Sequence, residues 1–108
     1  MRARPSFYDA EDAAYPGLQC RLSLARAAAL LGRLERRTGE KMPALSLGYG
    51  KDFHSATAGR LRLLYGDLRP IVLIHEWAHM MQQREDPGAP HHGAVFATLV
   101  CLLAEVIK

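Results

Sequence analysis

The sequence has few cysteines, no long apolar run and no apolar stretch near its start. Its two cysteines, Cys20 and Cys101, lie far apart and neither belongs to a C-x-x-C pair, so we expect neither a disulfide framework nor a cysteine zinc ribbon. The longest apolar stretch, 94–104, is interrupted by Thr98 and is shorter than the roughly 20 residues of a membrane-spanning helix. Acidic residues within positions 9–12 exclude the apolar middle of a secretory signal. We therefore expect a cytoplasmic protein that does not enter a membrane.

Composition is that of an ordinary globular protein. Hydrophobic residues make up 49% and charged residues 23%, as in soluble globular proteins. The length of 108 residues is enough for one hydrophobic core and one domain. We expect a single domain over 1–108, with residues 1–19 as an N-terminal arm that packs through Phe7, Tyr8 and Tyr15. The net charge of +3 is too small to identify a partner, and the oligomeric state stays open.

The first regular element predicted is an amphipathic helix over 23–38. Its apolar residues recur at helical spacing, Ser23 is a favoured first cap, and Gly39 can adopt the left-handed conformation that ends a helix. A stripe of arginines lies on the opposite face, at Arg26, Arg33 and Arg37. Such a stripe is more often a solvated surface than a nucleic-acid site, so nucleic acid is only a weakly supported partner.

The apolar pattern then changes to period two, which predicts strands. Leucines and a tyrosine alternate over 45–49 and again over 61–65, and turn-forming residues fill the space between these stretches. The two stretches predict a hairpin or two adjoining strands of a small sheet. Polar residues in or near these strands, Tyr49, His54, Arg60 and Tyr65, could stabilise a reaction intermediate, but strand surface or core edge is the favoured interpretation.

Two helices follow the strands. Asp67 is a candidate cap and Pro70 a favoured first-turn residue for a helix that runs to about Arg84, before Pro87 and Gly88. A last helix is predicted over 93–107 from its apolar face. The expected fold class is α+β, with an N-terminal helix, a small sheet or hairpin, and two C-terminal helices.

The first of these two helices carries the motif with chemical content, His75-Glu76-Trp77-Ala78-His79. Histidines at i and i+4 share one face of a helix, so both can bind one Zn²⁺ ion. A catalytic zinc has three protein ligands and an open position for water. Glu76 would lie beside that water and act as general base. Trp77 is expected to be a packing residue.

The third ligand must come from outside this helix. His92 is the favoured candidate because it precedes the last helix and lies four residues before the apolar Phe96. His91 is the weaker neighbour, better suited to a loop. Glu105 is the alternative carboxylate ligand of a gluzincin-type site, although it falls about half a turn away from the core face of the helix.

The motif is followed 13 positions later by His92-Gly93-Ala94-Val95-Phe96, and the two motifs together resemble the SprT-like minimal zincins. The resemblance spans about 61–107. It implies a metallopeptidase in which His75, His79 and His92 bind one zinc ion per chain and Glu76 is the catalytic base.

We therefore expect a zinc-dependent metallopeptidase acting on a protein or peptide. Two alternatives remain open at this point: a binding or regulatory module that keeps the scaffold without turnover, and a zinc hydrolase of a non-peptide amide. An intact Glu76 favours catalysis, since a site without turnover needs no base there.

Overall fold

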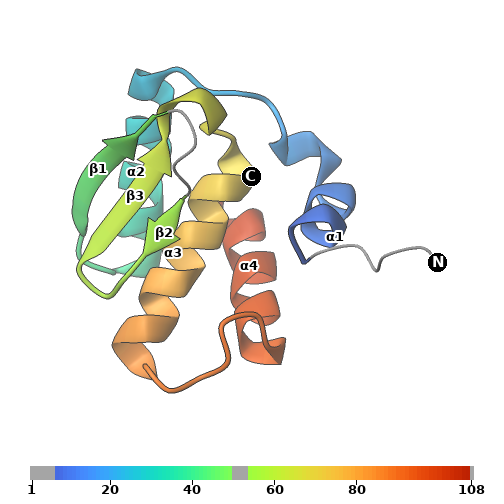
Figure 1. Ribbon diagram of the computed structural model, residues 1–108, viewed down its shortest axis with the longest axis vertical. Coiled ribbons are helices and arrows are strands. Elements are labelled where there is room, and N and C mark those ends of the chain that lie inside the picture. Colours follow the sequence, from blue (N-terminus) through green and yellow to red (C-terminus); the bar gives the residue numbers. More distant parts are fainter. Residues whose placement is uncertain (1–6, 50–53, 108) are drawn as a thin grey trace.

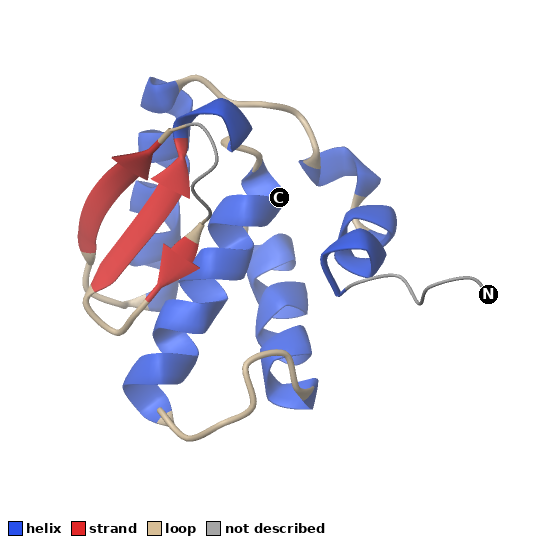
Figure 2. Cartoon of the chain, viewed as in Figure 1, coloured by secondary structure: helices blue, strands red, loops and turns tan. Residues whose placement is uncertain are grey.

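In the computed structural model the described residues are 7–49 and 54–107, with side chains described from residue 10 onward. Within those residues a small sheet lies at one side of the molecule with the helices behind and beside it (Figures 1 and 2), which confirms the α+β class. The elements, in chain order, are α1 (Phe7–Ala14), the 3-10 turn η1 (Pro16–Leu18), α2 (Leu24–Thr38), β1 (Ala44–Gly48), β2 (Ser55–Ala56), β3 (Arg60–Leu64), the 3-10 turn η2 (Tyr65–Asp67), α3 (Pro70–Glu85) and α4 (Ala94–Val106). None of the helices in this part of the chain has the length and apolar character needed to cross a membrane.

Local sequence signals define α2 at both ends, as predicted. The Ser23 hydroxyl accepts a hydrogen bond from the Arg26 backbone N–H at 3.2 Å, and Gly39 ends the helix with a φ of 73°. On the predicted basic face, the Arg33 guanidinium donates to the Ile107 carbonyl at 2.8 Å. This arginine therefore ties α2 to the end of α4.

The sheet has the strand order β1-β3-β2. β1 and β3 run parallel, with Leu45 opposite Leu61 and Leu47 opposite Leu63, and the two β3 leucines are buried in the core. The two predicted strands therefore adjoin each other but do not form a hairpin, because a hairpin needs antiparallel strands. The hairpin is made by β3 with β2, a two-residue strand too short to display a sequence period.

Helix α3 lies between the sheet and α4 and is the centre of the core (Figure 2). Every residue from Ile71 to Met80 is buried, as expected of a helix with neighbours on all sides. Trp77 and Met80 are 0% exposed, which confirms Trp77 as a packing residue. Pro70 occupies the first turn as predicted.

The predicted cap of α3 is wrong. Arg69 precedes the helix without a side-chain cap, and Asp67 lies in η2, where its carboxylate accepts hydrogen bonds from Arg69 and from the His54 ring. The Asp67 carboxylate is thus engaged by Arg69 and His54 and does not cap the backbone N–H groups at the start of α3. The hydrogen bonds from Arg69 and His54 outweigh burial and lower the pKa of Asp67.

The N-terminal segment, expected as an arm, forms the helix α1 and the turn η1. Tyr15 packs against the core as predicted, whereas the predicted contacts of Phe7 and Tyr8 fall outside the described side chains. Arg69 holds the segment by donating to Asp12 at 3.3 Å and to the side-chain carbonyl of Gln19. The segment is therefore fastened beside the start of α3.

Candidate metal centre

Three polar residues of the helical motif, His75, Glu76 and His79, are buried on α3. His75 is 1% exposed, Glu76 3% and His79 9%. Polar side chains at such depth cost free energy unless they find partners. The two histidines are one helical turn apart and their ring nitrogens Nε2 approach to 3.1 Å. The motif therefore projects two imidazoles toward one point.

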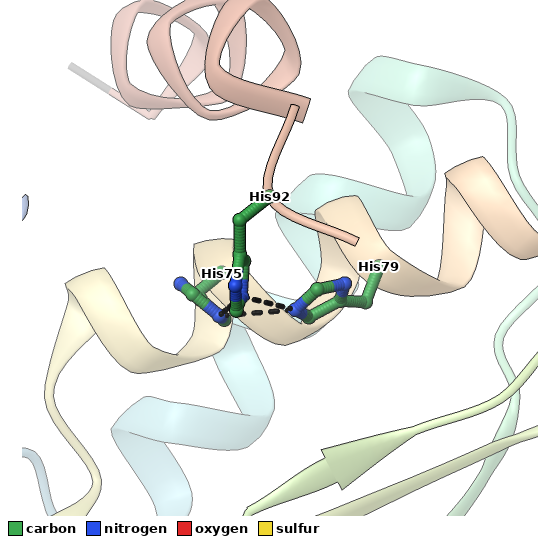
Figure 3. A group of neighbouring side chains, drawn as sticks. All are labelled: His75, His79 and His92. Atoms are coloured by element: carbon green, nitrogen blue, oxygen red, sulfur yellow. Dashed lines mark hydrogen bonds between the residues drawn. The ribbon is translucent and has the colours of Figure 1, made fainter. Parts of the chain in front are cut away.

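His92 reaches the same point from the turn that joins α3 to α4 (Figure 3). The turn closes with a hydrogen bond from the Gly93 N–H to the Pro90 carbonyl at 3.4 Å. A side chain at Gly93 would come within 3.3 Å of the Pro90 ring, so glycine suits this close approach. The tight turn directs the His92 ring down onto α3.

The Nε2 atoms of His75, His79 and His92, hereafter the histidine triad, are separated by 3.1, 3.2 and 3.4 Å. Two nitrogens bound at about 2.05 Å to one tetrahedral zinc ion lie about 3.3 Å apart. The spacing of the triad therefore fits three ligands of one ion. Among the described residues, these three form the group of potential ligand atoms close enough to share a metal.

A carboxylate from the N-terminal segment completes the buried surroundings of His75. Both oxygens of Glu11 lie within hydrogen-bond distance of His75 Nδ1, at 2.8 and 2.9 Å. Sequence reasoning missed Glu11, which lies 64 positions before His75. A carboxylate in the stretch 9–14, rich in alanine and acidic residues, is a signal too common to have identified it.

Hydrogen bonds cannot satisfy all three contacts of the triad. Each Nε2 atom either carries a hydrogen or presents a lone pair, and a hydrogen bond needs one of each. Among three nitrogens in mutual contact at least two are alike, so at least one contact joins two lone pairs or two hydrogens. A cation among the three nitrogens would satisfy every contact at once.

Phe96 forms the floor under the triad. Its ring stacks on His79 with a centroid distance of 4.3 Å, and contacts His75 and His92 at 4.9 and 5.2 Å through steeper angles. Phe96 is 0% exposed and lies on the first turn of α4. The four-residue spacing from His92 to Phe96 thus places a ligand candidate and its apolar support on the same side of the helix start.

Burial changes the protonation of these groups. It lowers the pKa of His79 to about 3, helped by the neighbouring histidines, and lowers the pKa of His92 in the same way. Burial raises the pKa of Glu76 to about 7, against the attraction of His75. The surroundings therefore favour neutral imidazoles and a carboxyl group that can take and release a proton near neutrality.

Two cavities open beside Glu76. One, of about 240 Å³, lies on the side of α1 and is lined by Glu11, Asp12, His54, Asp67, Arg69, Val72, His75 and Glu76. The other, of about 140 Å³, is lined by His54, Ser55, Ala56, Glu76, His79 and His91. We call them the arm-side cavity and the strand-side cavity. Glu76 and His54 contribute to both, so the base candidate can be reached from outside the core.

The remaining candidates lie away from the triad or beside it. His91 lines the strand-side cavity with its ring 5.8 Å from that of His79. Glu105 is exposed near the end of α4 and is not part of the group of potential ligands found among the described residues. Tyr49 and Tyr65 are exposed, with their ring centroids 5.8 Å apart. Arg60 is exposed on β3. Of the polar strand residues, His54 therefore lies nearest to the chemistry.

Comparison of the chain with known protein families, curated proteins and solved structures found no match. The likeness to SprT-like zincins therefore remains an expectation from two sequence motifs. Function has to be inferred from the residues and their geometry.

Proposed function

We propose that the protein is a zinc-dependent peptidase of the minimal zincin type, with Glu76 as its general base and the histidine triad as its metal ligands. One observation carries the proposal: three Nε2 atoms converge within 3.4 Å of one another, next to a buried carboxyl group that borders two cavities. A structural cluster of histidines would have no need of this carboxyl group.

The triad would hold one zinc ion through neutral nitrogens. Zinc held in this way would supply a water ligand with a pKa of about 7 and would polarise a carbonyl group. Glu76, adjacent in sequence to the first ligand, would take a proton from the water whose oxygen attacks the carbonyl carbon. As the C–N bond breaks, the same carboxyl group would give its proton to the leaving nitrogen, which yields a carboxylic acid and an amine.

The neighbourhood of β2 favours a peptide over another amide. In the described part of the chain β2 pairs with β3 on one side only, and it borders the strand-side cavity next to Glu76 and His79. Main-chain groups on the outer side of an edge strand can pair with an extended peptide. The edge strand therefore favours a peptide substrate.

We place the proposed reaction in the cytoplasm, and we do not assign DNA a part in it.

The test is metal content and cleavage measured on the same preparations. We expect the purified chain to contain about one zinc per molecule and to cut an unfolded protein such as casein. Glu76→Gln keeps the shape of the side chain and removes the base, so it should retain zinc while cleavage falls about 10²–10⁴-fold. Glu85→Gln, an exposed glutamate at the end of the same helix, is the matched control and should cut normally.

Two results would overturn the proposal. Cleavage by Glu76→Gln at the parent rate would remove the base from its role. A parent that binds zinc and cuts neither unfolded proteins nor peptides would support the binding or regulatory module instead.

A further inference from the structure

The N-terminal segment reaches the metal centre through one residue of α1. Both oxygens of Glu11 face His75 Nδ1 at 2.8 and 2.9 Å, while Nε2 of the same ring faces the other two histidines. Glu11 is 7% exposed and His75 is 1% exposed, so water competes little for this contact. The ring is therefore held between a carboxylate on one side and the triad on the other.

This contact determines what His75 can offer to a metal. A carboxylate only accepts hydrogen bonds, so Nδ1 of His75 carries a hydrogen and Nε2 is the nitrogen left for a metal. The lone pair of Nε2 then points into the triad without any rearrangement. The two oxygens also restrain rotation of the ring, because a turn about its χ2 angle would break both contacts.

The segment has a second attachment that does not involve His75. The Arg69 guanidinium donates to Asp12 and to Gln19, and the Gln19 amide donates to the Tyr15 carbonyl at 3.0 Å. These contacts fasten η1 and the end of α1 beside the start of α3. The segment is thus attached without Glu11, so attachment alone does not explain why this buried carboxylate contacts His75.

We infer that Glu11 is a positioning residue of the metal centre, so that the N-terminal segment is part of the site rather than an arm beside it. The inference rests on the proposed role of the triad as a zinc site. Glu11 orients the His75 ring, keeps its Nε2 free of hydrogen and makes the imidazole a stronger donor to the metal. Loss of such an outer carboxylate typically weakens metal binding about 10–100-fold.

The test is zinc affinity of the full chain, measured by competition with a chromogenic chelator. Glu11→Gln, which has nearly the same shape, and Glu11→Ala are each expected to weaken zinc binding about 10–100-fold. Glu11→Asp, with a shorter carboxylate, should recover part of the loss. In the Co²⁺-loaded protein the visible absorption bands should shift in Glu11→Ala, because the bands report the ligands of the ion.

Gln19→Ala is the matched control, since it weakens the other attachment of the segment and leaves His75 alone. It should bind zinc within about threefold of the parent and keep the parent Co²⁺ bands. Zinc binding within threefold of the parent in all three Glu11 variants would overturn the inference. Equal losses in Glu11→Ala and Gln19→Ala, with unchanged Co²⁺ bands, would also overturn it, because Glu11 would then only fasten the segment.

The outcome is separable from that of the proposed function. A parent that binds zinc but never cuts a protein leaves the Glu11 result intact, because its measure is affinity. A parent that binds zinc no better than His79→Ala removes the metal centre itself, and the inference falls with it. Circular dichroism of each metal-free variant shows whether it has the parent fold before affinities are compared.

Discussion

Replacement of His92 by alanine separates the triad from the other possible ligand sets. His92 belongs to the turn before α4 and is itself exposed, although its Nε2 atom lies 3.2 Å from that of His79. Its removal leaves no cavity in the core, unlike removal of a buried histidine of α3. We therefore expect His92→Ala to fold normally and to bind zinc poorly.

The size of the effect follows from the number of ligands. Structural zinc sites with four protein ligands bind with roughly 10–16 kcal/mol, or about 2.5–4 kcal/mol for each ligand. Each 1.4 kcal/mol corresponds to about a tenfold change in the dissociation constant. Loss of one imidazole from the triad should therefore raise the zinc Kd about 10²–10³-fold. The centroid contact between His92 and Phe96 adds little, since Phe96 keeps its contacts with the other two rings.

The assay is a chelator-competition titration of the parent and three variants. His91→Ala removes the neighbouring histidine of the same turn, and Glu105→Ala removes the carboxylate of the gluzincin-type alternative. We expect both controls to stay within about threefold of the parent. A normal Kd for His92→Ala would refute the triad, and a large loss in Glu105→Ala alone would make that glutamate the third ligand.

Other consequences can be measured on the same material. Phe96→Ala should lower the free energy of unfolding by about 3–5 kcal/mol, measured by urea unfolding, and should weaken zinc binding, measured by chelator competition. A variant as stable as the parent would contradict the position of Phe96 under the three histidine rings. Free zinc at about 100 times its Kd should stabilise the fold by about 2.7 kcal/mol, which raises the Tm by roughly 10–20 °C and is reversed by a chelator; an unchanged Tm would exclude the site. Burial lowers the pKa of His54 below the 6.5 of the unfolded chain, so its contribution to stability is present above pH 6.5 and is lost as the pH falls toward its folded value. His54→Gln should therefore lose less stability than the parent between pH 7 and pH 5 in urea unfolding, and equal losses would refute this assignment.

Local signals made α2, α3 and α4 predictable. Ser23 and Gly39 act on their own helix termini, and the helical period of α4 depends only on neighbouring residues. The spacing of His75 and His79 on α3 is also local, so the convergence of two rings follows from the sequence. The same holds for the pairing of His92 with Phe96 across the first turn of α4.

Contacts between distant segments were not predictable in this way. The parallel pairing of β1 with β3 depends on where the intervening chain passes, which a period of two does not report. Asp67 was expected as a cap because local propensity favours it, but a tertiary partner, His54, competes for its carboxylate. Glu11 meets His75 only after the N-terminal segment folds back, and no spacing in the sequence records that meeting.

The complete burial of α3 from Ile71 to Met80 has a consequence for how selectivity is divided within the molecule. The part of the helix that bears the reactive groups presents almost no surface outside the two cavities. Both cavities beside Glu76 are also lined by other parts of the described chain: α1, His54 with β2, Asp67 and Arg69 before α3, and the turn before α4. Substitutions in these surrounding parts can therefore alter which molecules are accepted without touching the helix, whereas changes within the helix disturb reactivity and folding together.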